Sequence, residues 1–130
     1  MKDSTVVVLV IAAVAAPIAY YLDRRAWRVR PRDQLVRLIT DGIWIKWGAA
    51  IAELKRRGED VSAYIPILLR TLLAESSMAR ESARICLKDH FPEVRPYLDK
   101  YTSTMPLDQA RILLAPALER FGVQAPSLGA

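Results

Sequence analysis

The chain has 130 residues, of which 52% are hydrophobic and 25% charged, and it carries a formal net charge of +5 at pH 7. Its one cysteine, Cys86, excludes an internal disulfide framework, and its one histidine, His90, excludes a site built from several histidines.

A long apolar segment opens the chain. Val6–Leu22 contains seventeen residues without a charge, and as a helix it would extend about 25 Å, which is near the short limit for a membrane span. Tyr20 and Tyr21 stand where an aromatic belt would meet the lipid headgroups. Residues 1–22 are therefore predicted to form an N-terminal transmembrane anchor.

Two other interpretations of this segment stay open. A secretory signal peptide would use Lys2 as its charged start and Ala13-Val14-Ala15 as its cleavage site, although Asp3 cancels the charge of Lys2. The protein would then be a secreted or periplasmic helical binding protein. A buried helix in a soluble core is the third interpretation, but it leaves the arginines that follow unexplained.

An arginine-rich segment follows, and residues 23–32 are interpreted as a basic juxtamembrane linker. Six arginines against two aspartates give residues 23–37 a net charge of +4. Such a cluster favours the cytoplasmic side, so the N-terminus is expected outside and the C-terminal domain in the cytoplasm. The residues expected to contact anionic lipid headgroups are Arg24, Arg25, Trp27, Arg28, Arg30 and Arg32. The alternative is a run of charges that is simply solvated.

The remaining residues show the 3.6-residue periodicity of amphipathic helices and no alternating β-branched strands. An all-α domain is predicted over 33–122, followed by a tail at 123–130. The expected helices lie within 33–40, 41–58, 60–76, 77–91, 93–101 and 106–122. Asp41 and Asp60 are predicted N-caps, and Gly58 and Gly122 are predicted helix ends.

The predicted helices show an internal repeat. Pro31, Pro66 and Pro96 recur at intervals of 35 and 30 residues. The pattern Arg80-x-x-Ala83-x-x-Cys86-Leu87 returns 31 residues later as Arg111-x-x-Leu114-x-x-Ala117-Leu118. Ala50 with Leu54 matches Ala83 with Leu87 at a spacing of 33 residues. A period of this size is typical of helical-repeat proteins.

On these residues the chain resembles the HEAT repeat family, whose members are α-solenoids. Residues 64–91 look like one full unit, 94–122 like a second and 31–58 like a degenerate third. The resemblance implies about three stacked helical hairpins and a protein-binding groove lined by the second helix of each pair. The short 93–101 helix and Pro116 inside the last helix depart from the pattern.

Residues that could carry chemistry are few. His90 follows Lys88 and Asp89 at a helix end, Cys86 lies on an apolar face, and the scattered glycines form no phosphate-binding loop. No catalytic, cofactor-binding or metal site is therefore predicted, and the chain is not expected to be an enzyme. A HEAT-like nucleic-acid-binding module is disfavoured, because residues 38–130 hold twelve Lys and Arg against eleven Asp and Glu.

Protein binding is the function that remains. The sequence favours a non-catalytic, membrane-anchored adaptor or accessory subunit that binds a partner protein in a membrane complex. On the helix after Ile43, Lys46, Glu53 and Arg57 form the polar stripe. The residues predicted to contact the partner, because the core faces of their helices are already assigned, are Trp44, Lys46, Arg84, Lys88, Arg111 and Ile112.

Overall fold

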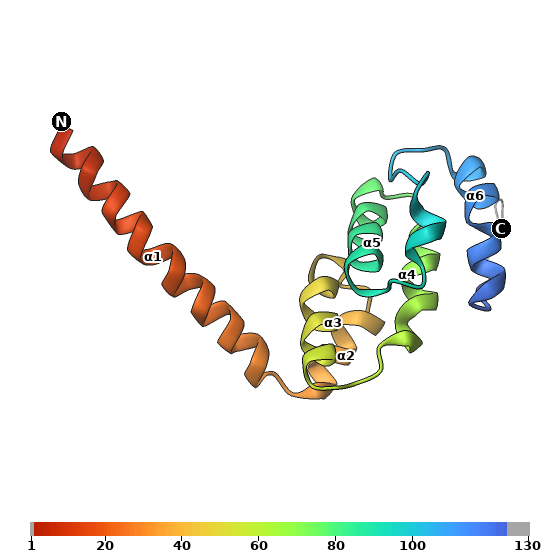
Figure 1. Ribbon diagram of the computed structural model, residues 1–130, viewed down its shortest axis with the longest axis horizontal. Coiled ribbons are helices and arrows are strands. Elements are labelled where there is room, and N and C mark those ends of the chain that lie inside the picture. Colours follow the sequence, from red (N-terminus) through yellow and green to blue (C-terminus); the bar gives the residue numbers. More distant parts are fainter. Residues whose placement is uncertain (1, 125–130) are drawn as a thin grey trace. The chain divides into compact units, whose positions relative to one another are not determined.

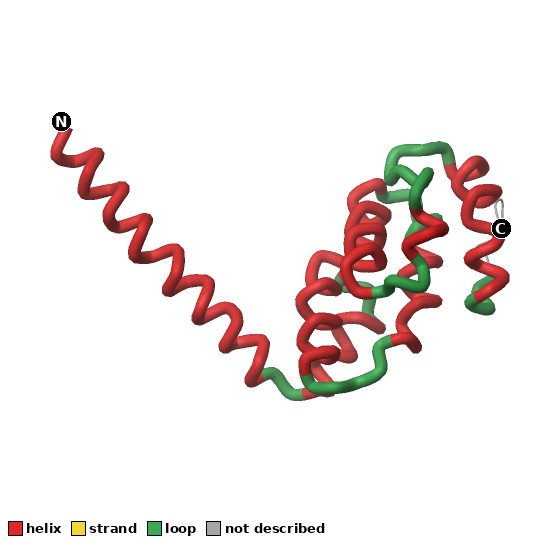
Figure 2. The backbone as a smooth tube through the Cα atoms, in the orientation of Figure 1, coloured by secondary structure: helices red, strands yellow, loops and turns green. Residues whose placement is uncertain are grey.

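The computed structural model describes the backbone of residues 2–124 and the side chains of residues 13–124. Over this range the chain forms six α-helices and three short 3₁₀ helices, with no strand (Figures 1 and 2). The predicted all-α class is thus confirmed for the described residues. Residues 125–130, most of the predicted tail, lie outside them.

The chain divides into two compact units, an N-terminal unit of residues 1–31 and a C-terminal unit of residues 32–130. The N-terminal unit consists of α1, Lys2–Val29, which continues without a break through the apolar segment and through most of the arginine-rich segment. Pro17 lies inside α1. It cannot donate the usual bond to the carbonyl four residues earlier.

The predicted membrane span is not supported. None of the helices, as far as they are described, is long and apolar enough to cross a membrane. In the part of α1 whose side chains are described, residues 13–22 include four alanines, one proline and two tyrosines, and Asp23 and three arginines follow within the helix. The predicted single-pass placement, with the N-terminus outside and the C-terminal domain in the cytoplasm, is therefore wrong.

The C-terminal unit contains its helices close to the predicted positions. They are α2 (Arg32–Thr40), η1 (Trp44–Lys46), α3 (Trp47–Arg56), η2 (Ser62–Tyr64), α4 (Ile65–Thr71), α5 (Ser77–His90), η3 (Arg95–Leu98) and α6 (Leu107–Arg120).

Two local predictions, one about a helix start and one about the 93–101 segment, need correction. The helix expected to begin after Asp41 starts as η1 and becomes α3 at Trp47, so Asp41 does not cap it, and the residue before α3 provides no side-chain cap. The segment expected as a helix at 93–101 is only the 3₁₀ turn η3, which has Pro96 in its first positions. Gly58 ends α3 as predicted, with φ +82° and its amide donating to the Lys55 carbonyl at 2.9 Å.

Helix α5 is the centre of the C-terminal unit. It packs against α3 and α4 and also contacts η1 and η3, while α2 packs on α3 (Figure 1). Helix α6 packs mainly on η3, at the end of the unit away from α2 and α3. The Lys55 ammonium donates to the His90 carbonyl at 3.1 Å, which joins the C-terminal ends of α3 and α5. These two helices therefore run in the same direction, and η1 lies near the start of α5.

The apolar faces predicted from periodicity form the core. Ala50, Leu54, Ala83 and Leu87 are fully buried, so small and large side chains alternate where α3 meets α5. The buried apolar side chains of the other helices include Leu35, Ile39, Leu68, Leu69, Leu72, Ala110, Leu114 and Ala117. Ile43, which the spacing aligns with the buried face of α3, is 40% exposed before η1.

Candidate functional site

The arginine-rich end of α1 carries most of the residues predicted to contact lipid headgroups. Five of the six lie on α1 or directly after it: Arg24, Arg25, Trp27, Arg28 and Arg30. The Arg24 guanidinium lies 5.3 Å from the centre of the Tyr20 ring, and that of Arg30 lies 4.1 Å from the Trp27 ring. These cation–π contacts, each worth about 0.5–1 kcal/mol at exposed sites, orient the two arginine side chains.

A hollow on the surface of α1 accompanies these contacts. It is lined by Tyr20, Tyr21, Arg24, Arg25 and Arg28. Because all its walls belong to one helix, it is an open depression between side chains and cannot enclose a small molecule.

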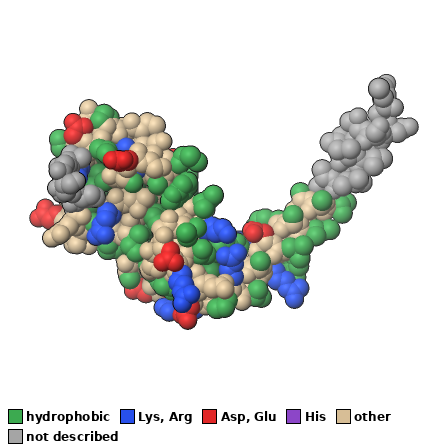
Figure 3. Space-filling view, turned by 180° about the vertical axis from the view of Figure 1, so that it is seen from behind, with side chains coloured by type: hydrophobic (Ala, Val, Ile, Leu, Met, Phe, Trp, Pro, Cys, Tyr) green, Lys and Arg blue, Asp and Glu red, His purple; other side chains and the backbone are tan. Residues whose placement is uncertain are grey.

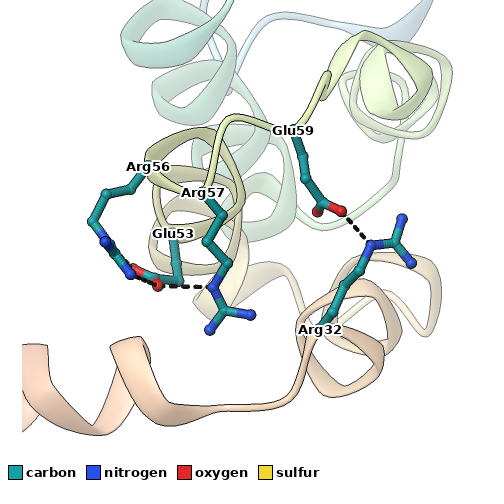
Figure 4. A network of polar contacts seen from close by, with 5 residues as sticks. All are labelled: Arg32, Glu53, Arg56, Arg57 and Glu59. Carbon is teal, nitrogen blue, oxygen red and sulfur yellow. Dashed lines mark hydrogen bonds and ion pairs between the residues drawn. The ribbon is translucent and has the colours of Figure 1, made fainter.

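The sixth residue of this group belongs to the C-terminal unit. Arg32 begins α2, and its Nε–H donates to the Glu59 carboxylate just beyond α3 (Figure 4). This ion pair joins the start of α2 to the loop after α3. The group predicted from the sequence is therefore divided between the two units.

A second ionic cluster lies at the end of α3 (Figure 4). Glu53 is only 6% exposed, although it was predicted on a polar stripe. Arg56 binds it through Nε and Nη2, at 2.9 and 2.6 Å, and the Nε–H of Arg57 donates to it at 2.9 Å. The hydrogen bonds from Arg56, followed by those from Arg57, lower the pKa of Glu53 to about 2. The carboxylate therefore stays ionised and is unsuited to general acid–base catalysis.

This cluster makes stability depend on pH in the acid range. A carboxylate whose pKa is lowered on folding stabilises the folded chain above its ordinary value of 4.5, and this contribution is lost as the pH falls toward about 2. We expect Glu53→Gln to lower the free energy of unfolding at pH 7. Near pH 2 the variant and the natural chain should have nearly the same free energy of unfolding. Urea unfolding at both pH values measures this, with the exposed Glu93→Gln as control. A constant difference across this range would contradict the ion-pair account.

The first predicted partner residues meet around α5. Trp44 is half-buried and Lys46 exposed on η1, which contacts α5. On α5, Arg84 is half-buried and its Nε–H donates to Glu81 at 2.8 Å. This arginine, followed by the Ser103 hydroxyl, lowers the pKa of Glu81 to about 2. The guanidinium of Arg84 is therefore already engaged within its own helix.

The other three predicted partner residues lie farther along the unit. Lys88 is half-buried near the end of α5, and its carbonyl accepts a hydrogen bond from Arg95 Nε at 2.5 Å. Arg111 is half-buried on α6, whereas Ile112 is 78% exposed. Because α6 packs mainly on η3, these two residues belong to a different part of the surface from Trp44 and Lys46.

Three exposed apolar side chains were not included in the sequence prediction. Ile45 on η1 is 75% exposed, and Met78 and Ile85 on α5 are 67% and 47% exposed. Met78 and Ile85 are seven residues apart and so share one face of α5. The signal was present in the sequence, because Met78 and Ile85 fall outside the face formed by the buried Ala79, Ala83 and Cys86. We call Ile45, Met78 and Ile85 the η1–α5 surface.

Reactive side chains of the C-terminal unit are poorly placed for chemistry. Cys86 is buried, which raises the pKa of its thiol to about 12 and disfavours the thiolate. Burial, with the nearby Lys55, lowers the pKa of His90 and favours its neutral form. Among the described residues, no group of three or more His, Cys, Asp and Glu side chains is placed to hold a metal ion.

Charges of both signs are spread over the C-terminal unit. On the face seen in Figure 3, Lys and Arg side chains alternate with acidic and hydrophobic ones. Comparison of the chain with protein-family models, curated proteins and solved structures found no match.

Proposed function

We propose that the C-terminal unit is a non-catalytic protein-binding domain that acts as an adaptor or accessory subunit in a protein complex. The observation that carries this proposal is the η1–α5 surface, with three large apolar side chains on two elements in contact. Single exposed apolar residues are common on folded proteins, but a group of them on adjoining elements is typical of an interaction surface.

The partner expected from this chemistry is an apolar segment of another protein. The η1–α5 surface offers isoleucine and methionine side chains, and methionine adapts its shape to irregular apolar surfaces. Trp44 and Lys46 lie beside Ile45 on η1 and would form the rim of the same contact. Tryptophan contributes to binding energy more often than most residues, so Trp44 remains part of the proposed site.

The proposal includes a HEAT-like arrangement of the helices. It is supported by the full burial of Ala50 and Leu54 on α3 and of Ala83 and Leu87 on α5, which hold corresponding positions in the repeat. In such an arrangement each helix pair covers the apolar face of its neighbour, so a short array still buries a continuous core. The outer face of α5 is then left for a partner.

Site-specific photo-crosslinking in cells that make this chain tests the proposal. A photoreactive amino acid placed at position 45, 78 or 85 is expected to capture the same protein, identified by mass spectrometry. Position 112 on α6 is the matched comparator, because Ile112 is as exposed as Ile45 but lies elsewhere on the unit. The proposal fails if positions 45, 78 and 85 capture nothing, or if position 112 captures the same protein equally well.

A further inference from the structure

Helix α1 carries more exposed large apolar side chains than any other described helix. Its large apolar side chains are between 53% and 71% exposed: Val14, Ile18, Tyr20, Tyr21, Leu22 and Val29. At about 1.5 Å per residue, its 28 residues extend about 42 Å. Apolar surface of this extent marks a site of interaction.

One line of apolar residues along α1 has the spacing of a coiled coil. Ala15, Ala19, Leu22, Ala26 and Val29 follow one another at intervals of four, three, four and three residues, and all five are exposed. In the sequence the same spacing reaches back to Ala12 and Val8, which makes three heptads. An alternation of three and four keeps one seam of a helix facing a neighbouring helix of the same period.

The residues that flank this seam also fit a coiled coil. With Ala19 and Ala26 at position a, and Ala15, Leu22 and Val29 at position d, Pro17 falls at position f, on the outer side of the helix. Charged Asp23, Arg25 and Arg30 fall at the flanking e and g positions, as expected of a coiled coil. The neighbouring line through Val14, Ile18 and Tyr21 is interrupted by Arg25 and Arg28.

We propose that this seam, Ala15 to Val29, binds the same seam of a second copy of the chain in an antiparallel coiled coil. A partner helix must repeat the 3.5-residue period to fill the holes between these side chains, and the chain itself supplies one. The alanines allow close approach of the two backbones. A lipid surface, by contrast, would impose no such period on α1.

The charges select the antiparallel orientation. Residues 23–30 hold four arginines against one aspartate, a net charge of +3. A parallel pair would place two such clusters side by side, where like charges repel. An antiparallel pair places each cluster beside the uncharged half of the other helix. It also sets Ala15 against Ala26 of the second copy and Ala19 against Leu22.

Disulfide trapping of the full chain tests both the contact and its direction. Chains carrying Ala15→Cys and chains carrying Ala26→Cys, distinguished by tags of different size, are mixed and mildly oxidised. We expect the disulfide-linked mixed dimer to form, because positions 15 and 26 face each other, and each variant alone to remain largely without a crosslink. The unaltered chain controls for Cys86, which is buried. Disulfide-linked dimers of each variant with itself, or no disulfide-linked dimer in the mixture, would overturn the proposal.

Sedimentation velocity provides a second measurement that does not depend on disulfide geometry. The natural chain is expected to sediment as a dimer, and Leu22→Glu, which places a charge in the seam, as a monomer. Arg24→Ala, at the outer f position, is the matched control and should leave the dimer intact. If the natural chain is monomeric and associates only with vesicles containing anionic lipid, the second copy is not the occupant of this surface. Both tests concern α1 alone, so their outcome is independent of the η1–α5 surface.

Discussion

Arg80→Met is expected to destabilise the folded chain by about 3 kcal/mol, because it removes a buried charge that makes several hydrogen bonds. Arg80 Nε donates to the Tyr101 hydroxyl at 2.8 Å, and its two terminal nitrogens donate to the carbonyls of Met105 and Thr102 at 2.9 and 3.3 Å. Tyr101 in turn donates to the Leu72 carbonyl at 2.6 Å. Arg80 thus fixes the loop before α6 to the centre of the unit.

Urea unfolding followed by circular dichroism measures this effect. Arg111→Met is the matched control, because Arg111 holds the corresponding place in the repeated pattern but is half-buried on α6. We expect the control to change the free energy of unfolding by less than about 1 kcal/mol. Equal losses of unfolding free energy for the two variants would show that the hydrogen bonds of Arg80 add nothing to the stability of the folded chain.

Trp47→Ala is expected to cost about 3–5 kcal/mol, the usual range for removal of a large buried aromatic side chain. Trp47 is almost fully buried at the start of α3. Its indole N–H lies 3.2 Å from the carbonyl oxygens of Leu38 and of Ile39 at the end of α2. The side chain therefore fills the space between α2 and α3 and also satisfies the end of α2.

Trp47→Phe separates these two contributions, because phenylalanine keeps much of the apolar volume but has no N–H donor. A smaller loss, on the order of 1–2 kcal/mol, is expected from the missing hydrogen bond and the reduced volume. Thermal unfolding of both variants beside the natural chain provides the comparison. A Trp47→Ala chain as stable as the natural one would mean that α2 does not depend on this contact.

The helices of the C-terminal unit were predictable because their periodicity follows directly from burial. Ala83, Cys86 and Leu87 were picked out by their spacing in the repeated pattern, and all three are buried in α5. The 3₁₀ starts at η1 and η2 were not predictable in this way, because the same apolar spacing fits either kind of turn. The predicted membrane span rested on the length of the uncharged segment and on the tyrosines at its end, and among the described residues no helix is long and apolar enough to cross a membrane.

The burial of two charged side chains, Glu53 and Arg80, was not predicted from the sequence. Glu53 was placed on a polar stripe, yet it is buried because Arg56 and Arg57, three and four residues later, bind it on the same helix. That spacing can be read from a sequence. The burial of Arg80 cannot, because the groups it binds lie 21 to 25 residues away. Exposed Met78 and Ile85 could have been found by asking which apolar residues fall outside the core face.

The most direct test of the protein-binding account uses an Ile45→Glu, Ile85→Glu double variant. Its affinity for the partner identified by crosslinking is measured together with the melting temperature of the full chain. Both side chains are exposed, so the charges should not disturb the core. The account predicts that the variant loses at least about tenfold in partner affinity, equivalent to about 1.4 kcal/mol, while the melting temperature stays unchanged. Full retention of the partner by a stably folded double variant would contradict it.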